Sequence, residues 1–134
     1  MFFEINFKGG EAVGGFWGRL WTKTVSLHRI LYEQYGRSGY VQIVFVEASQ
    51  GFLVAHPRHG QNEWEENKDI GRLLAERGEA VVLLPNQVDR PSPDALRGGD
   101  EWEFKTVKSQ EVSRAIQHAL RRGKNNHPIF FVWY

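Results

Sequence analysis

The fold of this chain is decided by residues 80–107, which read AVVLLPNQVDRPSPDALRGGDEWEFKTV. Residues 80–84 are an unbroken apolar run, which is typical of a strand covered on both faces of a sheet. After a polar loop, Gly98-Gly99 separates two short strand-like segments, residues 93–96 and 101–107, as a tight hairpin turn does. The stretch therefore predicts a buried strand followed by a hairpin.

Helical patterns stand on both sides of this stretch. Residues 63–77 place Glu66, Ile70 and the pair Leu73-Leu74 on one face, and Gly78 is a signal for the end of a helix. Ser109 is expected to cap a second helix, in which Glu111 lies in the first turn. The apolar stripe of that helix is expected to consist of Val112, Ala115, Ile116, Ala119 and Leu120. A buried strand over residues 129–133 completes an α-β-β-β-α-β order from residue 63 onward.

The first 60 residues follow a different order. Alternating Phe3, Ile5 and Phe7 predict a strand, and apolar residues from Trp17 to Tyr35 predict a helix that stops at Gly36. Residues 40–47 and 52–56 favour an antiparallel hairpin around the turn at residues 48–51. We therefore expect an α/β fold with a mixed central sheet flanked by helices, in which a β-α-β-β extension precedes the core.

Length and composition limit the classes of protein. At 134 residues the chain is expected to be a single domain, 1–134, with an N-terminal extension, 1–60, and a core, 61–134. Hydrophobic residues at 41% and charged residues at 25% are typical of a globular fold. The absence of cysteine excludes disulfides, thiolate nucleophiles and Cys-ligated zinc. The sequence shows no apolar run of membrane-spanning length and no signal-peptide pattern, so we expect a cytoplasmic site of action, with delivery as a fragment of something larger an open alternative.

Charge is unevenly distributed along the chain. Residues 105–124 hold six basic residues and one acidic residue, whereas the first 104 residues hold eleven basic and fifteen acidic ones. Arg114, His118 and Arg121 fall on one face of the expected second core helix. Together with Arg122 and Lys124 they are candidates for binding the phosphates of a nucleic acid. The alternative is an ordinary solvated helix surface.

The hairpin carries the candidate catalytic residues. Side chains alternate along a strand, so Glu103 and Lys105 share one face, and the hairpin brings Asp94 beside them. Two neighbouring carboxylates repel each other unless a cation or a shared proton neutralises them, and oxygen ligands of this kind suit Mg²⁺ or Mn²⁺. Asp94 and Glu103 are thus predicted metal ligands and Lys105 a group beside the metal-bound water. The alternative is a surface hairpin whose Glu103 and Lys105 form a solvated pair.

These residues also resemble a known signature. Pro93-Asp94, eight intervening residues and Glu103-Phe104-Lys105 resemble the PD-(D/E)xK nuclease motif, and the element order is similar to the restriction-endonuclease-like core of that superfamily. More narrowly, residues 60–134 resemble the C-terminal nuclease domains of CdiA-like contact-dependent inhibition proteins and other polymorphic bacterial toxins. The resemblance does not extend to residues 1–59.

The resemblance implies a metal-dependent nuclease, often one that cleaves tRNA, paired with an immunity protein. It implies a further acid from the helix before the first core strand, for which Glu66 is the best candidate and Glu63, one turn earlier, the alternative. Related toxins often carry lysine followed by glutamine after the last helix, whereas this chain has Gly123-Lys124-Asn125-Asn126. That departure leaves the choice between RNA and DNA open.

Two other functions remain open from the sequence. His56 and His59, together with Lys105, are the residue types that metal-independent ribonucleases of the barnase, EndoU, colicin and RelE-like kind use for acid–base chemistry. A non-catalytic nucleic-acid or protein-binding module is the other alternative, with a homodimer around Trp17 and Trp21. His28 is expected to be a core or interface residue.

Overall fold

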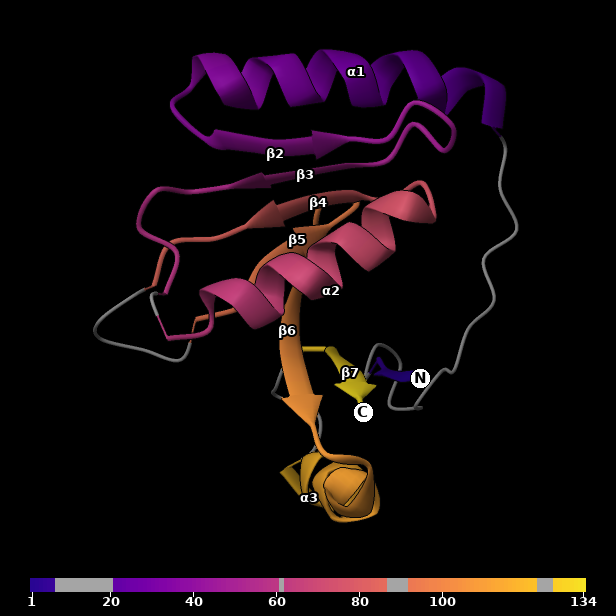
Figure 1. The fold of residues 1–134 in the computed structure, drawn as a ribbon, viewed down its shortest axis with the longest axis vertical. Coiled ribbons are helices and arrows are strands. Elements are labelled where there is room, and N and C mark those ends of the chain that lie inside the picture. Colours follow the sequence, from indigo (N-terminus) through magenta and orange to yellow (C-terminus); the bar gives the residue numbers. More distant parts are fainter. Residues whose placement is uncertain (7–20, 61, 87–91, 123–126) are drawn as a thin grey trace.

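The computed structural model describes residues 1–6, 21–60, 62–86, 92–122 and 127–134, with the side chains of residues 21–26 left aside. In this part of the chain three α-helices flank a seven-stranded mixed sheet, so the predicted α/β class is confirmed (Figure 1). The elements are β1 (Phe2–Ile5), α1 (Trp21–Arg37), β2 (Val41–Phe45), β3 (Phe52–Ala55), α2 (Trp64–Glu76), β4 (Ala80–Leu83), β5 (Ala95–Arg97), β6 (Asp100–Val107), α3 (Val112–Arg122) and β7 (Ile129–Trp133). None of the described helices is long and apolar enough to cross a membrane.

The strands lie in the order β1-β7-β6-β5-β4-β3-β2. The pairs β3–β4 and β6–β7 are parallel and the other neighbours are antiparallel. Strand β6 changes partner along its length, because residues 100–102 pair with β5 and residues 103–107 pair with β7. The sheet thus has an upper part, β2 to β5, and a lower part, β7 and β1, which only β6 joins (Figure 1).

Helices cover both faces of the upper part of the sheet. Phe52 and Val54 of β3 pack with tyrosines of α1, whereas Leu53 and Ala55 of the same strand pack with Ile70 and neighbouring residues of α2. Strand β4 alternates in the same way, and all four of its residues are buried. The prediction that the apolar run at residues 80–84 forms a strand covered on both faces is therefore confirmed.

The lower part of the sheet has its own small core under α3. Ile5 of β1, Ala119 of α3, and Ile129 and Phe131 of β7 are buried together. Each of these residues is at most 4% exposed. The N-terminal strand therefore belongs to the same sheet as the C-terminal one, and it pairs with it through residues 2–5.

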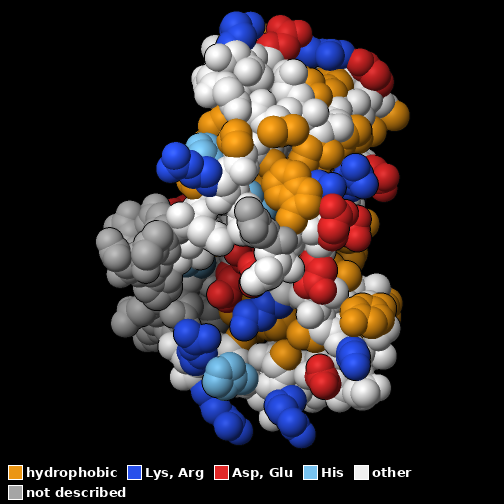
Figure 2. Space-filling view, turned by 60° about the vertical axis from the view of Figure 1, so that its left-hand side comes forward, with side chains coloured by type: hydrophobic (Ala, Val, Ile, Leu, Met, Phe, Trp, Pro, Cys, Tyr) orange, Lys and Arg blue, Asp and Glu red, His pale blue; other side chains and the backbone are white. Residues whose placement is uncertain are grey.

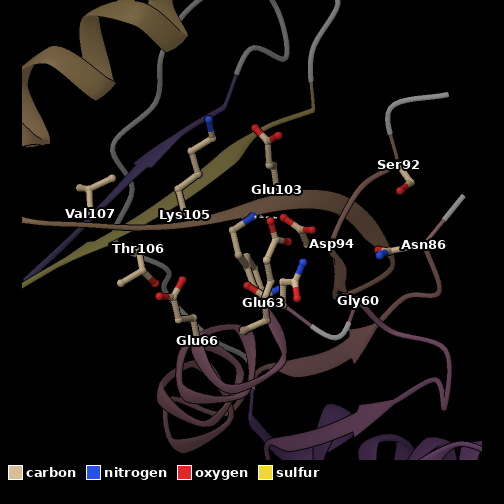
Figure 3. Close-up of a pocket in the computed structure, with 13 residues that line it drawn as sticks. Gly60, Glu63, Glu66, Asn86, Ser92, Asp94, Glu103, Lys105, Thr106 and Val107 are labelled. Carbon is tan, nitrogen blue, oxygen red and sulfur yellow. Dashed lines mark hydrogen bonds between the residues drawn. The ribbon is translucent and has the colours of Figure 1, made fainter. Parts of the chain in front are cut away.

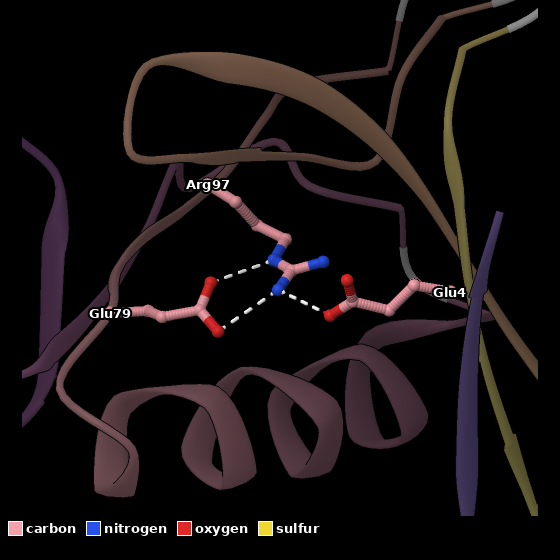
Figure 4. A network of polar contacts seen from close by, with 3 residues as sticks. All are labelled: Glu4, Glu79 and Arg97. Carbon is pink, nitrogen blue, oxygen red and sulfur yellow. Dashed lines mark hydrogen bonds and ion pairs between the residues drawn. The ribbon is translucent and has the colours of Figure 1, made fainter. Parts of the chain in front are cut away.

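A buried ion cluster ties β1 to the hairpin of β5 and β6. The Arg97 guanidinium donates hydrogen bonds to Glu79 at 2.8 and 2.9 Å and to Glu4 at 2.7 Å (Figure 4). Its charge also lies over the Trp102 ring at 4.2 Å and the Phe130 ring at 5.0 Å. Three segments far apart in the sequence are thus joined where the two parts of the sheet meet.

Glycines close the turns where the sequence places them. Gly98 and Gly99 have φ angles of +55° and +91°, which a two-residue hairpin turn requires and which glycine adopts without strain. Gly78, with φ of +90°, follows the end of α2 as predicted.

Several predicted boundaries need correction. Helix α1 runs through Gly36 to Arg37, and the glycine with the left-handed φ that is typical of a helix end is Gly39, at +93°. The first strand covers residues 2–5, and Phe7, which was predicted to belong to it, lies outside the described residues. The predicted start of α1 at Trp17 lies outside the described residues.

The start of the last helix also differs from the prediction. Residues 109–111 form a single 3₁₀ turn before α3, and the hydroxyl of Ser109 donates to the backbone oxygen of Tyr134 at 2.9 Å instead of capping the helix. Leu120, predicted to lie on the apolar stripe, is 46% exposed. Ser109 is placed by its contact with the chain end beside β6, and Leu120 lies at the edge of the small lower core. Local spacing in the sequence shows neither of these tertiary contacts.

Candidate active site

A cavity of about 560 Å³ lies where β6 changes partner (Figure 3). Its walls come from the start of α2, the segments before β5, and the second half of β6. The lining residues are Gly60, Asn62, Glu63, Glu66, Asn67, Asn86, Ser92, Asp94, Glu103, Phe104, Lys105, Thr106 and Val107. All four residues predicted to be catalytic, Asp94, Glu103, Lys105 and Glu66, therefore line a single cavity.

Asp94 is held in place by its backbone and its side chain. Its backbone N–H donates to Trp102 at 2.9 Å, and its carbonyl oxygen accepts from the Leu84 N–H at 2.9 Å, so the residue continues the β4–β5–β6 pairing. Its carboxylate accepts a hydrogen bond from the Phe104 N–H at 2.8 Å. The predicted position of Asp94 beside β6 is thus fixed by these three hydrogen bonds.

Burial raises the pKa of Asp94 from 3.8 to about 6. The hydrogen bond from Phe104 lowers the pKa, the negative charges of Glu63 and Glu103 raise it, and the Lys105 ammonium lowers it. A carboxyl group with a raised pKa in a cleft is a common property of functional sites, because it is desolvated beside other charges.

Glu103 and Lys105 extend from one face of β6, as their spacing predicted (Figure 3). The intervening Phe104 and the preceding Trp102 point into the main core on the other face. The Glu103 N–H donates to the Pro128 oxygen at 2.8 Å, which attaches this point of β6 to the segment before β7. A carboxylate and an ammonium are thereby presented side by side from a strand whose opposite face is buried.

The two candidate helix acids stand differently. Glu63 immediately precedes α2, and its charge acts on Asp94. Glu66 lines the cavity farther along, near Thr106 and on the side of β6 opposite Glu103 and Lys105 (Figure 3). Of the two candidates, Glu63, the alternative from the sequence, is therefore the one whose charge acts on Asp94. An acid at a helix N-terminus is also stabilised by the helix dipole.

The carboxylates fit one kind of metal ion better than others. Within the described ranges, no group of three or more histidine or acidic side chains is arranged to hold a metal ion. Zinc sites need three or four such ligands, whereas Mg²⁺ commonly keeps several waters and uses one or two carboxylates. Asp94 and Glu103, which interact electrostatically across the cavity, match the second pattern.

His59 has a structural position. It is 4% exposed, its Nδ1 lies against the Leu84 carbonyl oxygen, and its Nε2 lies 3.0 Å from the Asn67 amide nitrogen. Burial lowers its pKa, which favours the neutral ring that donates from Nδ1 and accepts at Nε2. Both ring nitrogens of His59 therefore have partners, and one of these partners, Asn67, lines the cavity.

The other histidines of the first 60 residues also make structural contacts. Nδ1 of His56 accepts a hydrogen bond from the Arg58 N–H at 3.0 Å, and its ring packs on Tyr40. His28, predicted to be a core or interface residue, is partly buried and packs edge-on against buried Phe52. The pair His56 and His59 is therefore poorly placed for acid–base chemistry.

A second cavity, of about 50 Å³, opens beside the first between β6 and α3. Its lining residues are Ser92, Glu103, Lys105, His118, Ala119, Arg122, His127 and Ile129. His118 was predicted to bind substrate and lies here, whereas Arg114 and Arg121 are exposed and line neither cavity. Figure 2 shows acidic side chains at a hollow midway along the molecule, and Lys, Arg and His side chains below it at the height of α3.

His127 was absent from the predicted phosphate-binding group, whereas Arg122 belonged to it. The signal for Arg122 is its spacing of four residues from His118, which places both on one helix face. His127 follows a segment outside the described residues, and only the return of the chain into β7 brings it to the cavity.

Trp17 and the side chain of Trp21, the predicted dimer contacts, lie outside the described part of the chain. Leu27, Ile30 and Leu31 of α1 are exposed by 56%, 49% and 39%.

Comparison of the chain with family models, curated proteins and solved structures found no match.

Proposed function

We propose that this chain is a metal-dependent nuclease that hydrolyses phosphodiester bonds of nucleic acid. The observation that carries the proposal is that Asp94, Glu103 and Lys105 line one open cavity at the point where β6 changes partner, and that the charges of Glu103 and Lys105 act on Asp94. The PD-(D/E)xK-like spacing and the α-β-β-β-α-β order of elements support it.

Each residue has a distinct role in the proposed reaction. Asp94 and Glu103 would hold Mg²⁺ or Mn²⁺, and Glu63 or Glu66 would complete the acidic wall. Such a cation, when bound, supplies positive charge at the phosphate and lowers the pKa of a water ligand. The Phe104 N–H orients the Asp94 carboxylate through the hydrogen bond at 2.8 Å. The Lys105 ammonium is available to stabilise negative charge that develops on the phosphate.

The proposal also includes a substrate, a partner protein and a place of action. The resemblance to bacterial toxin domains favours RNA, with tRNA as the leading candidate, and an immunity protein as partner. It also favours action in the cytoplasm of a target cell after delivery from a larger secreted protein. The cationic surface over α3 supports a nucleic-acid substrate, because phosphates are attracted to such surfaces.

The test is cleavage of RNA and DNA panels by purified protein. Excess chelator, Asp94→Asn and Glu103→Gln should each reduce the rate by at least about a thousandfold, because the charge stabilisation of the transition state is lost. Glu101→Gln is the matched control: it removes the same charge from the same strand at an exposed position outside the cavity, and should keep full activity. Equal rates for Glu101→Gln and Glu103→Gln would refute the proposed site.

A metal-independent ribonuclease is the second candidate. The observation that favours it is that His118 and His127 border the small cavity together with Lys105, so imidazoles lie on the same face as the lysine. Cleavage that persists in excess chelator and leaves 2′,3′-cyclic phosphate ends would establish it. Lys105→Ala should be inactive under both mechanisms, because in each the ammonium stabilises charge on the phosphate.

A further inference from the structure

We propose that the small cavity between β6 and α3 is a phosphate subsite, which binds the phosphate next to the one that is cleaved. This inference rests on the proposed function and adds a binding element of stated chemistry to it. The groups that form the subsite are Lys105 of β6, His118 and Arg122 of α3, and His127 before β7.

The charge of the lining selects an anion. Lys105 and Arg122 are cationic, the two histidines offer ring N–H donors, and Glu103 is the single acid in the lining. Glu103 also borders the main cavity, where the proposed cation site would neutralise it. A guanidinium and an ammonium at one small concave site are the groups that proteins use to bind phosphate oxygens.

The size of the cavity selects a small group. A volume of about 50 Å³ is well below the ~300 Å³ at which pockets for whole organic ligands begin. It is close to the space of two water molecules, at about 30 Å³ each. A phosphate group fits a site of this size, whereas a nucleobase with its sugar does not.

The two cavities are continuous through shared residues. Ser92, Glu103 and Lys105 line both of them. Glu103 and Lys105 extend toward the α3 side of β6, so a nucleic-acid strand that occupies the main cavity reaches the small one by crossing these two side chains (Figure 3). Consecutive phosphates of one strand would then lie in the two cavities.

The floor of the subsite is rigid. Ala119 and Ile129 line the cavity and are 4% and 3% exposed as members of the lower core. His118 and Arg122 are four residues apart on α3, so one helix face carries both groups. The cationic groups are therefore mounted on packed secondary structure.

The chain provides a matched pair of arginines for the test. Arg121 and Arg122 are adjacent, both exposed and both in the last turn of α3, but only Arg122 lines the cavity. Arg121→Gln and Arg122→Gln change the net charge equally, so long-range attraction of nucleic acid should change by the same amount. A difference between the two variants measures the subsite.

The first experiment uses inorganic phosphate and does not depend on cleavage. Titration of the protein with phosphate, followed by NMR signals of the His118 and His127 rings, should shift both rings in a saturable manner. Arg122→Gln should weaken the apparent affinity about tenfold, because a charge-assisted hydrogen bond is lost, and Arg121→Gln should leave it unchanged. Equal titration curves for the two variants, or no saturable shift in the unmodified protein, would overturn the inference.

The second experiment separates this inference from the proposed function. With RNA as substrate, Arg122→Gln should raise KM about tenfold relative to Arg121→Gln and leave kcat within about threefold. Metal-dependent cleavage with equal KM for both variants would refute the subsite alone. Phosphate binding that needs Arg122, in a protein that cleaves no member of the RNA and DNA panels, would refute the nuclease proposal alone. Cleavage that resists chelator and disappears in His118→Gln would overturn the subsite, since His118 would then be an acid–base group.

Discussion

The hairpin of β5 and β6 carries two clusters of charged side chains that differ in burial and in the balance of their charges. At the turn end, Arg97 is 5% exposed and is paired with Glu79 and Glu4 (Figure 4). At the other end, only three residues earlier in the chain, Asp94 faces an open cavity with Glu63, Glu103 and a single ammonium, Lys105 (Figure 3). The first is called the Arg97 cluster and the second the Asp94 cluster.

The two clusters differ in how far charged partners compensate a buried group for the loss of surrounding water. Burial alone lowers the pKa of Arg97, but the hydrogen bonds and charges of Glu79 and Glu4 raise it overall, so its partners compensate for lost water. The surroundings of Asp94 raise its pKa to about 6, so the folded protein resists ionising it. The Arg97 cluster therefore has the electrostatics of a structural connection, whereas in the Asp94 cluster the carboxylates outnumber the single ammonium, as is common at functional sites.

The largest effect is expected at Arg97. Arg97→Met should lower the free energy of unfolding by about 3–5 kcal/mol, because Glu4 would remain buried without its partner and Glu79 would lose its own. Urea unfolding at pH 7 measures it, with Arg72→Met on the exposed face of α2 as the control, which should change stability by less than about 0.5 kcal/mol. A loss below about 1 kcal/mol at Arg97 would mean that the cluster acts like a solvated ion pair.

The Asp94 cluster should respond in the opposite direction. Because the pKa of Asp94 is 3.8 in the unfolded reference and about 6 in the folded protein, the stability that its protonated form contributes is complete below pH 3.8. That stability is lost as the pH rises through about 6. Asp94→Asn mimics the protonated acid and can still accept the Phe104 hydrogen bond.

Asp94→Asn should therefore stabilise the protein at pH 8 by about 1–2 kcal/mol. A fully buried group with this shift would give about 3 kcal/mol, and solvent in the cavity reduces the effect. Urea unfolding in the presence of chelator, at pH 8 and at pH 4, tests this, and the gain should nearly vanish at pH 4. Equal stabilisation at both pH values would show that charge at Asp94 is not its cause.

A smaller effect distinguishes the two helix acids. Glu63→Gln should lower the pKa of Asp94 from about 6, because a neighbouring negative charge that raises it is removed. Glu66→Gln should leave the pKa of Asp94 unchanged, since Glu66 lies farther along the cavity, near Thr106, and its charge is not among those that act on Asp94 (Figure 3). NMR titration of the Asp94 carboxyl carbon gives both values. A larger effect from Glu66→Gln would restore Glu66 as the acid that acts with Asp94.

The smallest effect on stability is expected at Lys105. Lys105→Met should change the free energy of unfolding by less than about 0.5 kcal/mol, because the side chain borders two open cavities and is only partly buried. The same variant should abolish cleavage under the proposed function. Stability from urea unfolding and cleavage rates from one preparation show whether the two effects separate. Destabilisation as large as that of Arg97→Met would place Lys105 among the structural charges.

Local patterns were sufficient for most of the fold. The apolar run at residues 80–84, the glycine pair at 98 and 99 and the helix end at Gly78 were identified correctly, because backbone preference and side-chain period act over a few residues. The helix through Gly36 and the hydroxyl of Ser109 were predicted wrongly. The left-handed φ at the end of that helix belongs to Gly39 rather than Gly36, and the Ser109 hydroxyl donates to Tyr134, a contact distant in sequence that local spacing does not indicate.

For the candidate site, the sequence alone determined which charged side chains lie together: alternation along a strand places Glu103 and Lys105 on one face, and a two-residue turn returns the chain so that Asp94 lies beside that strand. Only the tertiary structure decided that Glu63 acts on Asp94, that His59 is locked by Leu84 and Asn67, and that Arg122 faces a cavity where Arg121 does not. The physical reason is that these properties depend on desolvation and on contacts between elements distant in the sequence. Burial and charge at one residue are set by the packing of α2 and α3 against β6, which exists only in the folded chain.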